Sequence, residues 1–177
     1  NMIFETAEQG HSLSKAAYKN ALPGLREDLL DLQQTLRKAD FPVIVVFAGV
    51  DGAGKGEVVN LLNEWMDPRW LLTRAYTDPS DEEDERPEFW RYWRDLPPKG
   101  QIGLFLSSWY SRPLLNHVMN GATDAEFDLQ LQRIKAFEKM LADDGALILK
   151  FWMHLGKKQQ KKRFEKLESD KRTRWRV

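Results

Sequence analysis

The sequence predicts an α/β fold, a three-layer sandwich in which helices cover both faces of a mainly parallel, doubly wound sheet. Three observations support this prediction. Apolar segments typical of strands alternate along the chain with segments of helical periodicity. The first strand candidate, residues 43–47, is apolar at every position, as expected of a strand buried on both faces of a parallel sheet. A glycine-rich loop joins this strand to a helical segment.

The first predicted element is a helix that ends near Ala39. Leucines recur at helical spacing from Leu25 to Leu36. Pro23 suits the first turn of a helix, where the missing amide hydrogen is not needed. We therefore expect an N-terminal helical segment over residues 12–39, followed by a core over residues 42–177.

The core is predicted to contain further strands and helices in alternation. The spacing of Ser80 with Glu83, and of Thr123 with Glu126, is typical of a capping box. We expect the first helix to include residues 89–93, and the second to stop at the glycine of position 145. A basic helix is expected over residues 157–167. The strand candidates are residues 43–47, 71–76, 102–106 and 146–153.

Length and composition fit one domain over residues 1–177. With 42% hydrophobic residues the chain can bury a core. It has no cysteine, hence neither a disulfide nor a thiolate metal site. The apolar runs are far shorter than the roughly 18 residues of a membrane helix, and no signal-peptide pattern is present. We predict a cytoplasmic protein without a membrane partner, and we interpret Asn1, ahead of Met2, as a remnant of an expression tag.

Charge is unevenly distributed although 27 basic residues balance 27 acidic ones. Residues 78–88 are strongly acidic, and residues 157–176 are strongly basic. The basic end either attracts a polyanion or forms a solvated helix face, and both interpretations remain open. Zero net charge and the lack of interleaved aromatic and basic residues argue against a nucleic-acid partner.

A phosphate-binding loop is the strongest motif. Residues 49–55, with the sequence GVDGAGK, match the first seven positions of the Walker A pattern G-x-x-x-x-G-K, between a buried strand and a helix. Such a loop directs backbone amides and a helix N-terminus at phosphate oxygens, and its lysine reaches the transferred or bridging phosphate. The motif predicts a P-loop NTPase-like fold; the alternative is a glycine-rich turn with an exposed lysine. The residues predicted to bind phosphate or nucleotide are Gly49, Gly52, Ala53, Gly54, Lys55 and Gly56.

Two positions of the loop depart from the common pattern. Gly56 stands where serine or threonine usually offers a hydroxyl to Mg²⁺. Asp51 lies inside the loop, where a carboxylate repels phosphate unless a cation screens it. Asp51 is therefore a candidate ligand for Mg²⁺ or a candidate base. Capping of the following helix is the alternative role.

The motifs together resemble those of the polyphosphate kinase type 2 family. The series Gly49-x-Asp51-x-x-Gly54-Lys55-Gly56 is similar to the Walker A variant of that family. Residues 108–112, SWYSR, resemble its second motif, an Asp-Arg-Ser-Trp-Tyr-Asn-Arg block after the third strand. Residues 149–152 and 157–164 resemble the following strand and basic helix. Residues 79–83 and 90–100 resemble the N-terminal half of two-domain polyphosphate:AMP phosphotransferases.

This resemblance implies phosphoryl transfer between inorganic polyphosphate and a nucleotide, with AMP and ADP as partners and Mg²⁺ bridging phosphates. It implies that Lys55 binds the transferred phosphate, that Asp51 is a metal ligand or base, and that Arg112 clamps a phosphate. It also implies a second family domain in the full-length protein and a truncated C-terminal end here; a homo-oligomer is left open. The residues implied to bind polyphosphate are Lys157, Lys158, Lys161, Lys162 and Arg163.

The second motif departs from the family at two positions, because Leu106 and Ser107 replace its aspartate and arginine. Loss of a carboxylate and a cation weakens stabilisation of a phosphoryl-transfer transition state. Three hypotheses follow: an active phosphotransferase domain, a non-catalytic half that binds polyanion or supports an active second domain, and a P-loop kinase of another small substrate.

Other polar and aromatic residues have structural alternatives. Arg112 is either a phosphate clamp or a surface arginine stacked on an aromatic ring. Trp109 and Tyr110 are expected to pack in the core rather than face a base. We expect the arginines of residues 86–94 to pair with nearby acids rather than approach the nucleotide. The histidines show no metal-ligand spacing, and no chemistry is assigned to His11, His117 or His154.

Overall fold

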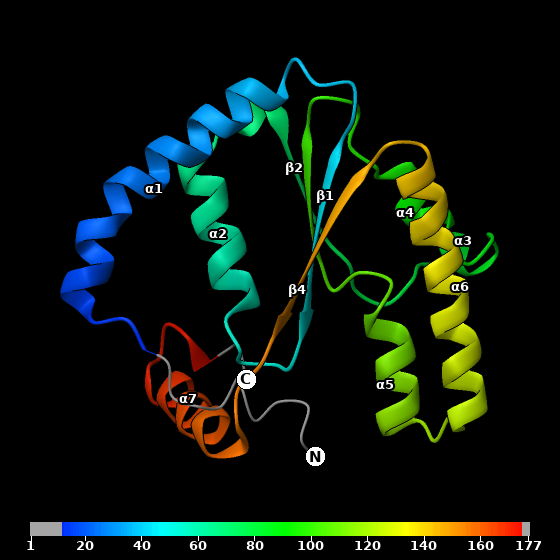
Figure 1. Ribbon diagram of the computed structural model, residues 1–177. Coiled ribbons are helices and arrows are strands. Elements are labelled where there is room, and N and C mark those ends of the chain that lie inside the picture. The colour runs from blue at the N-terminus through cyan, green and yellow to red at the C-terminus, as the bar shows by residue number, and fades with distance from the viewer. Residues whose placement is uncertain (1–11, 175–177) are drawn as a thin grey trace.

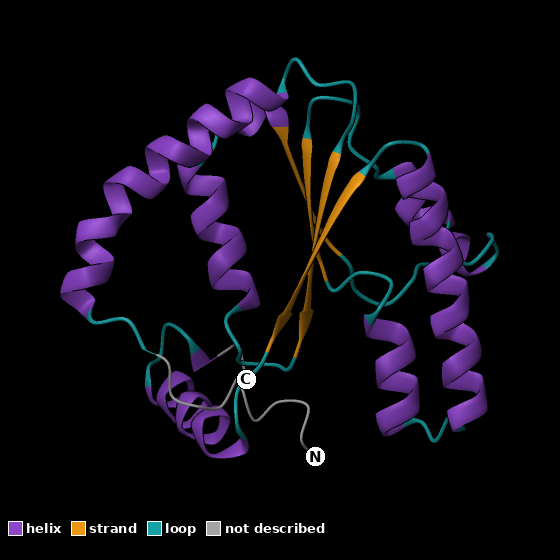
Figure 2. Cartoon of the chain, in the orientation of Figure 1, coloured by secondary structure: helices purple, strands orange, loops and turns teal. Residues whose placement is uncertain are grey.

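A computed structural model describes residues 12–174, and four strands of this part of the chain form one parallel sheet in the order β2-β3-β1-β4 (Figures 1 and 2). The strands are β1 (Val43–Gly49), β2 (Leu71–Ala75), β3 (Ile102–Leu106) and β4 (Leu147–Met153). The predicted strands are confirmed with small shifts at their ends. Asn1, Met2, His11 and residues 175–177 lie outside the described residues.

Helices cover both faces of the sheet, as the sequence predicts. Helices α1 and α2 lie on one face, α4 and α6 lie on the other, and α7 lies beyond the carboxyl ends of β1 and β4 (Figure 1). The α/β fold with a parallel, doubly wound sheet is therefore confirmed. The helices are α1 (Lys15–Leu36), α2 (Lys55–Trp65), α3 (Asp81–Asp84), α4 (Trp90–Arg94), α5 (Ser111–Met119), α6 (Asp124–Asp143) and α7 (Lys157–Ser169), with the 3-10 turn η1 (Pro68–Trp70).

Strand β1 lies at the centre of the core and supplies both of its apolar clusters. Val45 and Phe47 pack towards Val59 of α2, whereas Ile44 and Val46 pack with α6 on the other face. This alternation explains why β1 is apolar at every position, since no face of it meets water.

Among the described residues, no helix is both long and apolar enough to span a membrane.

Strand β4 differs from β1 because it has a described neighbour on one side only. It pairs with β1 from Leu147 to Met153. Its side chains at Leu149, Phe151 and Trp152 are 40%, 49% and 44% exposed. The apolar pattern of β4 thus predicts its strand conformation, but in residues 12–174 it does not lead to full burial.

The prediction that Pro23 opens the first helix is wrong. Helix α1 begins at Lys15, and Pro23 lies inside it. The Ser14 side chain accepts a hydrogen bond of 3.1 Å from the amide of Ala17, which satisfies a donor of the first turn. An interior proline removes one intrahelical hydrogen bond, and a long helix with a good cap tolerates this loss.

The segment after Ser80 contains two short helices instead of one. The capping box is present, because Ser80 accepts from the amide of Glu83 and the Glu83 carboxylate accepts from the amide of Ser80. Helix α3 nevertheless ends at Asp84, and the aromatic residues belong to α4. Pro87 lies between them and disfavours the helical conformation at Arg86.

The second capping box is confirmed at the start of α6. Thr123 and Glu126 exchange both capping hydrogen bonds. Gly145, with φ of 95°, follows the helix end as predicted. Helix α7 confirms the basic helix, whereas α5 was not predicted from the sequence.

One buried polar side chain links α1 to the connection between α2 and β2. Gln33 is fully buried, and its amide nitrogen donates to the carbonyl of Asp67 at 2.9 Å. Its amide oxygen accepts from the backbone N–H of Asp67 at 2.8 Å. Both groups of this amide are therefore satisfied by one backbone position, which fixes α1 against the core.

We expect Gln33→Ala to lower the free energy of unfolding by about 2 kcal/mol, because two hydrogen bonds are lost and the backbone groups of Asp67 lose their partners. Urea denaturation followed by circular dichroism measures this change. Gln34→Ala, one position along on the exposed side of α1, is the matched control and should change stability by no more than about 0.5 kcal/mol. Equal losses in both variants would contradict the assigned role of Gln33.

Candidate active site

The glycine-rich loop leaves β1 at the carboxyl edge of the sheet and leads into α2 (Figure 1). Gly49, Gly52 and Gly54 have φ of 121°, 77° and 97°, which side chains disfavour. A Cβ atom at Gly49 would lie 2.0 Å from the carbonyl oxygen of Met153. The amide of Val50 donates to that same oxygen at 3.0 Å. The loop is therefore fixed to the end of β4 by its first two residues.

The N-terminus of α2 opens onto this loop. Its N-cap is Gly54, which has no side-chain hydrogen bond to the helix. Amides of a first helical turn without a side-chain cap, together with the helix dipole, favour anion binding. The alternative in which Asp51 caps α2 is wrong, because the Asp51 carboxylate instead accepts from the ammonium of Lys55 at 3.2 Å.

Lys55 lies in the loop rather than in solvent. Its Nζ donates to the carbonyl oxygens of Gly49 and Val50 at 2.7 and 3.0 Å, in addition to its contact with Asp51. The Lys55 side chain is 14% exposed, and that of Asp51 is 90% exposed. The alternative of a glycine turn with an exposed lysine is therefore wrong. An ammonium lies inside the loop, with a solvated carboxylate beside it.

Helix α7 packs against the outside of the same loop. The side-chain amide of Gln160 donates to the carbonyl of Asp51 at 2.7 Å, and Arg163 pairs with Glu57 of α2 at 2.9 Å. The ring of Phe164 lies against Gly52. The lysines predicted to bind polyphosphate are exposed on this helix at positions 157, 158, 161 and 162. The fold thus brings the basic segment beside the loop, although more than 100 residues separate Gln160 from Asp51 in sequence.

A groove of about 1020 Å³ lies between the segments that follow β2 and β3. Its lining includes the arginines of positions 86, 91, 112 and 133 and the acids of positions 83, 84 and 88. Arg112 pairs with Asp84 at 3.2 Å and does not stack on an aromatic ring of the described chain. Residues 49–56 are absent from the described lining, so Arg112 is not brought into contact with Lys55 or Asp51.

The arginines near the acidic segment form structural pairs, as expected. Arg86 pairs with Glu82 at 3.4 Å, and Arg94 pairs with Asp95 at 3.5 Å. Glu83 is a further acidic partner: it binds Arg91 at 3.4 Å and Arg94 at 3.3 Å. The two pairs of Glu83 connect α3 to α4 on one wall of the groove.

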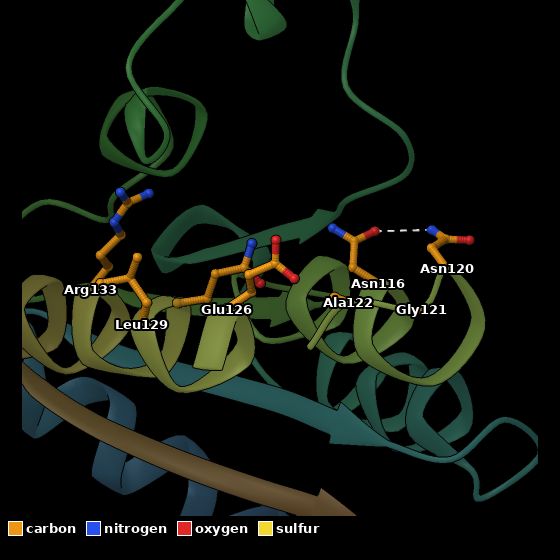
Figure 3. A pocket seen from close by; sticks show the side chains of 8 residues that line it. Asn116, Asn120, Gly121, Ala122, Glu126, Leu129 and Arg133 are labelled. Atoms are coloured by element: carbon orange, nitrogen blue, oxygen red, sulfur yellow. Dashed lines mark hydrogen bonds between the residues drawn. The ribbon is translucent and has the colours of Figure 1, made fainter. Parts of the chain in front are cut away.

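A smaller hollow of about 440 Å³ lies between α5 and α6 (Figure 3). Asn116 and Asn120 share a hydrogen bond of 3.0 Å on one side of it. The Glu126 carboxylate is already bound by the amide and hydroxyl of Thr123 at 2.8 Å each. The polar groups of this hollow mainly serve the ends of α5 and α6, and we assign no chemistry to it.

The two departures from the second motif lie where β3 ends. Leu106 packs against the apolar cluster beneath α1 and α2. Ser107 is, among residues 12–174, the one non-glycine residue with positive φ, at 54°. Backbone in this region is strained for a residue with a side chain and is frequent at functional sites. No local pattern indicated this conformation.

Trp109 and Tyr110 pack in the core, as predicted. Trp109 is 2% exposed, and its ring meets that of Phe137 edge-on at 5.2 Å. Both residues donate to Glu138 of α6, a residue that sequence reasoning missed. The available signal was an acidic residue on the apolar stripe of α6, four positions after Ile134.

The loop offers one carboxylate, that of Asp51, to a metal ion. Among the described residues, no three His, Asp or Glu side chains are grouped so as to hold a metal. Mg²⁺ usually takes only one or two carboxylates and completes its shell with water and phosphate. The exposed carboxylate of Asp51 meets that requirement, whereas Gly56 and Leu106 have no ligand atom in their side chains.

Comparison with known proteins identifies the family. The family model described as polyphosphate kinase 2 matches residues 12–177. The chain belongs to the polyphosphate kinase 2 family. It is 49% identical over 176 residues to a polyphosphate:AMP phosphotransferase of Pseudomonas aeruginosa, and the match covers 99% of this chain and 36% of that protein. A GDP-polyphosphate phosphotransferase of Mycobacterium tuberculosis is 35% identical, with 93% of this chain and 56% of that protein covered.

Solved polyphosphate kinase 2 structures share the fold. A crystal structure from Pseudomonas aeruginosa has a TM-score of 0.87 at 51% identity, covering 92% of this chain and 36% of that one. A structure from Arthrobacter aurescens has a TM-score of 0.86 at 29% identity, covering 94% and 61%. The chain thus spans about a third of the polyphosphate:AMP phosphotransferases that it matches, at 36% and 35% of their length. The resemblance to a part of such proteins is confirmed, and assignment to their N-terminal half stays a prediction.

Tyr76 lines the groove and is held in its neutral form. Its hydroxyl donates to Asp95 at 3.2 Å, and its ring packs edge-on against those of Tyr92 and Phe105. Burial, followed by the charge of Asp95, raises the pKa of Tyr76 strongly. Burial likewise raises the pKa values of Tyr92 and Tyr110.

Gly49 of the loop and Gly56 of α2 should respond differently to an added methyl group. Gly49→Ala should destabilise the protein by about 3 kcal/mol or more, because its Cβ meets the backbone of Met153 and its φ is positive. Gly56→Ala is the matched control, since it lies in α2 with no atom within 4 Å of the added Cβ, and should stabilise by about 0.5–1 kcal/mol. Thermal unfolding of both variants tests this. A tolerated Gly49→Ala would show that the loop does not abut β4 as described.

Alkaline pH should destabilise the fold through its buried tyrosines. A folded-state pKa above the unfolded value gives stability that is full below about pH 10 and is lost as pH rises through the folded pKa. Above about pH 10 the slope of the unfolding free energy against pH is proportional to the number of protons released on unfolding. We expect this number to be smaller by about one in Tyr76→Phe, so that the free energy falls less steeply. Urea denaturation at several pH values from about 9 to 11 measures the slope, with Tyr18→Phe on exposed α1 as the control for a lost hydroxyl. An unchanged slope in Tyr76→Phe would contradict the burial of its hydroxyl.

Proposed function

We propose that this domain transfers a phosphoryl group between inorganic polyphosphate and a nucleotide, with AMP converted to ADP in the presence of Mg²⁺. The observation that supports this best is the Lys55 ammonium inside a glycine loop at the start of α2, 3.2 Å from Asp51. Family membership and the names of the relatives agree with the reaction. The proposal keeps the predicted cytoplasmic location.

The loop residues would bind the phosphate that is transferred. Backbone amides of residues 52–56, including those at the α2 N-terminus, would donate to its oxygens. Lys55 would exchange the carbonyls of Gly49 and Val50 for phosphate oxygens. Asp51 would hold Mg²⁺ or accept a proton. The bound ion supplies positive charge between neighbouring phosphates.

The exposed face of α7 would bind the rest of the polyphosphate chain. Lys157, Lys158, Lys161 and Lys162 project from a helix that contacts the loop directly through Gln160. Clustered cations attract a polyanion over distances up to a Debye length, about 8 Å at physiological salt. Arg163 can also contact the polyphosphate chain once its ion pair with Glu57 is released.

The arginine-lined groove would receive the nucleotide. It lies at the carboxyl edge of parallel strands, where ligands of open α/β sheets bind. Arg112 forms an exposed pair with Asp84, with side chains 64% and 55% exposed, and can exchange that carboxylate for the phosphate of AMP. Arg112 thus keeps its predicted role as a clamp, on the acceptor side of the reaction.

A second candidate function is a non-catalytic half that binds polyanion and supports an active domain elsewhere in the full-length protein. The observation that favours it is Leu106, which packs in the apolar cluster where the family motif has a carboxylate. The loop and α7 would still bind polyphosphate in that case, without turnover.

The first test is ADP formation from AMP, polyphosphate and Mg²⁺. We expect turnover that falls at least about 100-fold in Lys55→Ala, because a positioned cation on the transferred phosphate is lost. Lys99→Ala, an exposed lysine between α4 and β3, is the matched control and should retain activity.

A wild-type chain that binds polyphosphate without turnover would overturn the catalytic proposal in favour of the non-catalytic half. Activity that persists in Lys55→Ala would overturn the role assigned to the loop. Binding of polyphosphate is measured separately by its retention on the immobilised protein, with duplex DNA as a comparison polyanion.

A further inference from the structure

Glu138 connects three parts of the molecule through one carboxylate. Its Oε1 accepts from the indole Nε1 of Trp109 at 3.0 Å and from the hydroxyl of Tyr110 at 2.8 Å. Its Oε2 accepts from Nζ of Lys150 at 2.8 Å. Helix α6, the turn after β3 and strand β4 therefore meet at a side chain that is 12% exposed.

The charges of this network fix which group donates and which accepts. Burial alone would lower the pKa of Lys150, but its hydrogen bonds to Glu138 and Tyr110 raise that pKa on balance. Burial, and then the bond to Glu138, raises the pKa of Tyr110. Lys150 thus stays a cation and Tyr110 a neutral donor. A part-buried carboxylate with three donors is stable only while they stay in place.

The turn that Glu138 holds has one local backbone hydrogen bond, from the amide of Ser111 to the carbonyl of Ser108 at 3.0 Å, and it contains a strained residue. Ser107 is in the strained left-handed region, with φ of 54°. Helix α5 starts at Ser111, and its N-cap, Tyr110, has no side-chain capping bond. A strained turn persists only where contacts from elsewhere in the fold determine it. The bonds from Glu138 to two consecutive residues of the turn are such contacts.

We propose that Glu138 is a positioning residue: by binding Trp109 and Tyr110 it fixes the turn between β3 and α5, and thereby places Arg112 at the groove. The part of this inference that concerns Arg112 rests on the proposed function, in which Arg112 binds the acceptor phosphate. The part that concerns the turn rests on the geometry alone.

Packing of the indole ring does not replace this role. Trp109 meets Phe105, Phe137 and Tyr92 edge-on, with centroids 5.2–5.8 Å apart. These contacts bury the ring, whereas the bond to Glu138 determines which edge of it faces α6. Glu138→Gln keeps the shape and the packing of the side chain and removes its charge, so it separates the two effects.

The first experiment is amide hydrogen exchange of the whole chain. In Glu138→Gln we expect exchange of segment 107–115 to become about tenfold faster, because a charge-assisted network is weakened, while segment 43–49 stays unchanged. Asp128→Asn, which removes an exposed charge from the same helix, is the control and should change neither segment. Unchanged exchange at 107–115, or an increase spread evenly over both segments, overturns the proposal.

The second experiment links the turn to Arg112. In ADP formation we expect Glu138→Gln to lower kcat/KM for AMP about tenfold and to leave KM for polyphosphate unchanged. In the double variant with Arg112→Ala, the loss of kcat/KM for AMP should be smaller than the product of the losses in the two single variants, because Glu138 acts through Arg112. Losses that multiply would overturn the link to Arg112.

Absence of turnover in the wild-type chain would count against the proposed function alone, and the exchange experiment would still decide the positioning role. Tyr110→Phe is the second variant should Glu138→Gln not fold. It removes one hydrogen bond of the network, and we expect a smaller increase of exchange in the same segment. No change there would also overturn the proposal.

Discussion

The pairing of β1 with a strand on each side determines where every functional segment lies. Phe47 stands opposite Leu106 of β3, and Gly49 stands opposite Met153 of β4. All described strands are parallel, so the loop after β1, the turn after β3 and the start of α7 emerge at one edge of the sheet. Gly49 is the tightest point of this arrangement, because the backbone of Met153 leaves no room for a side chain. Chemistry at this edge thus depends on a close backbone contact.

Local signals explain which elements the sequence predicts. Strand β1 and the loop after it were predicted because apolar branched residues favour a buried strand and glycines favour a tight loop wherever they occur. Helix α6 was predicted because both of its ends carry local signals. Helix α5 has no such signal, since its N-cap is Tyr110 without a capping bond. The division into α3 and α4 follows from Pro87. The capping box correctly predicted the start of a helix, but Pro87 prevents that helix from continuing. Pro23 misled because the cap that starts α1 lies nine residues earlier, at Ser14.

The candidate site was predicted as a set of residues but not as a set of contacts. Lys55 and Asp51 are four positions apart in one motif, so their proximity followed from the sequence. The contact of Gln160 with Asp51 and the pair of Arg163 with Glu57 join residues 109 and 106 positions apart, and no pattern specifies them. Arg112 likewise makes no contact with Lys55 or Asp51, because α5 and α2 lie on opposite sides of the sheet (Figure 1).

The cations of the candidate site already have partners, so binding of phosphate exchanges contacts rather than adding them. Arg112 and Arg163 pair with Asp84 and Glu57 at exposed positions, where an ion pair is worth about 0–1 kcal/mol and is easily released. Lys55 is different, because its side chain is 14% exposed and its ammonium meets three acceptors. Only a ligand with several charged oxygens can replace those acceptors without loss, since a buried ammonium with fewer partners is costly. Under the proposed function, the loop would therefore discriminate for phosphate through Lys55, whereas the arginines would adapt their contacts to the phosphate that binds.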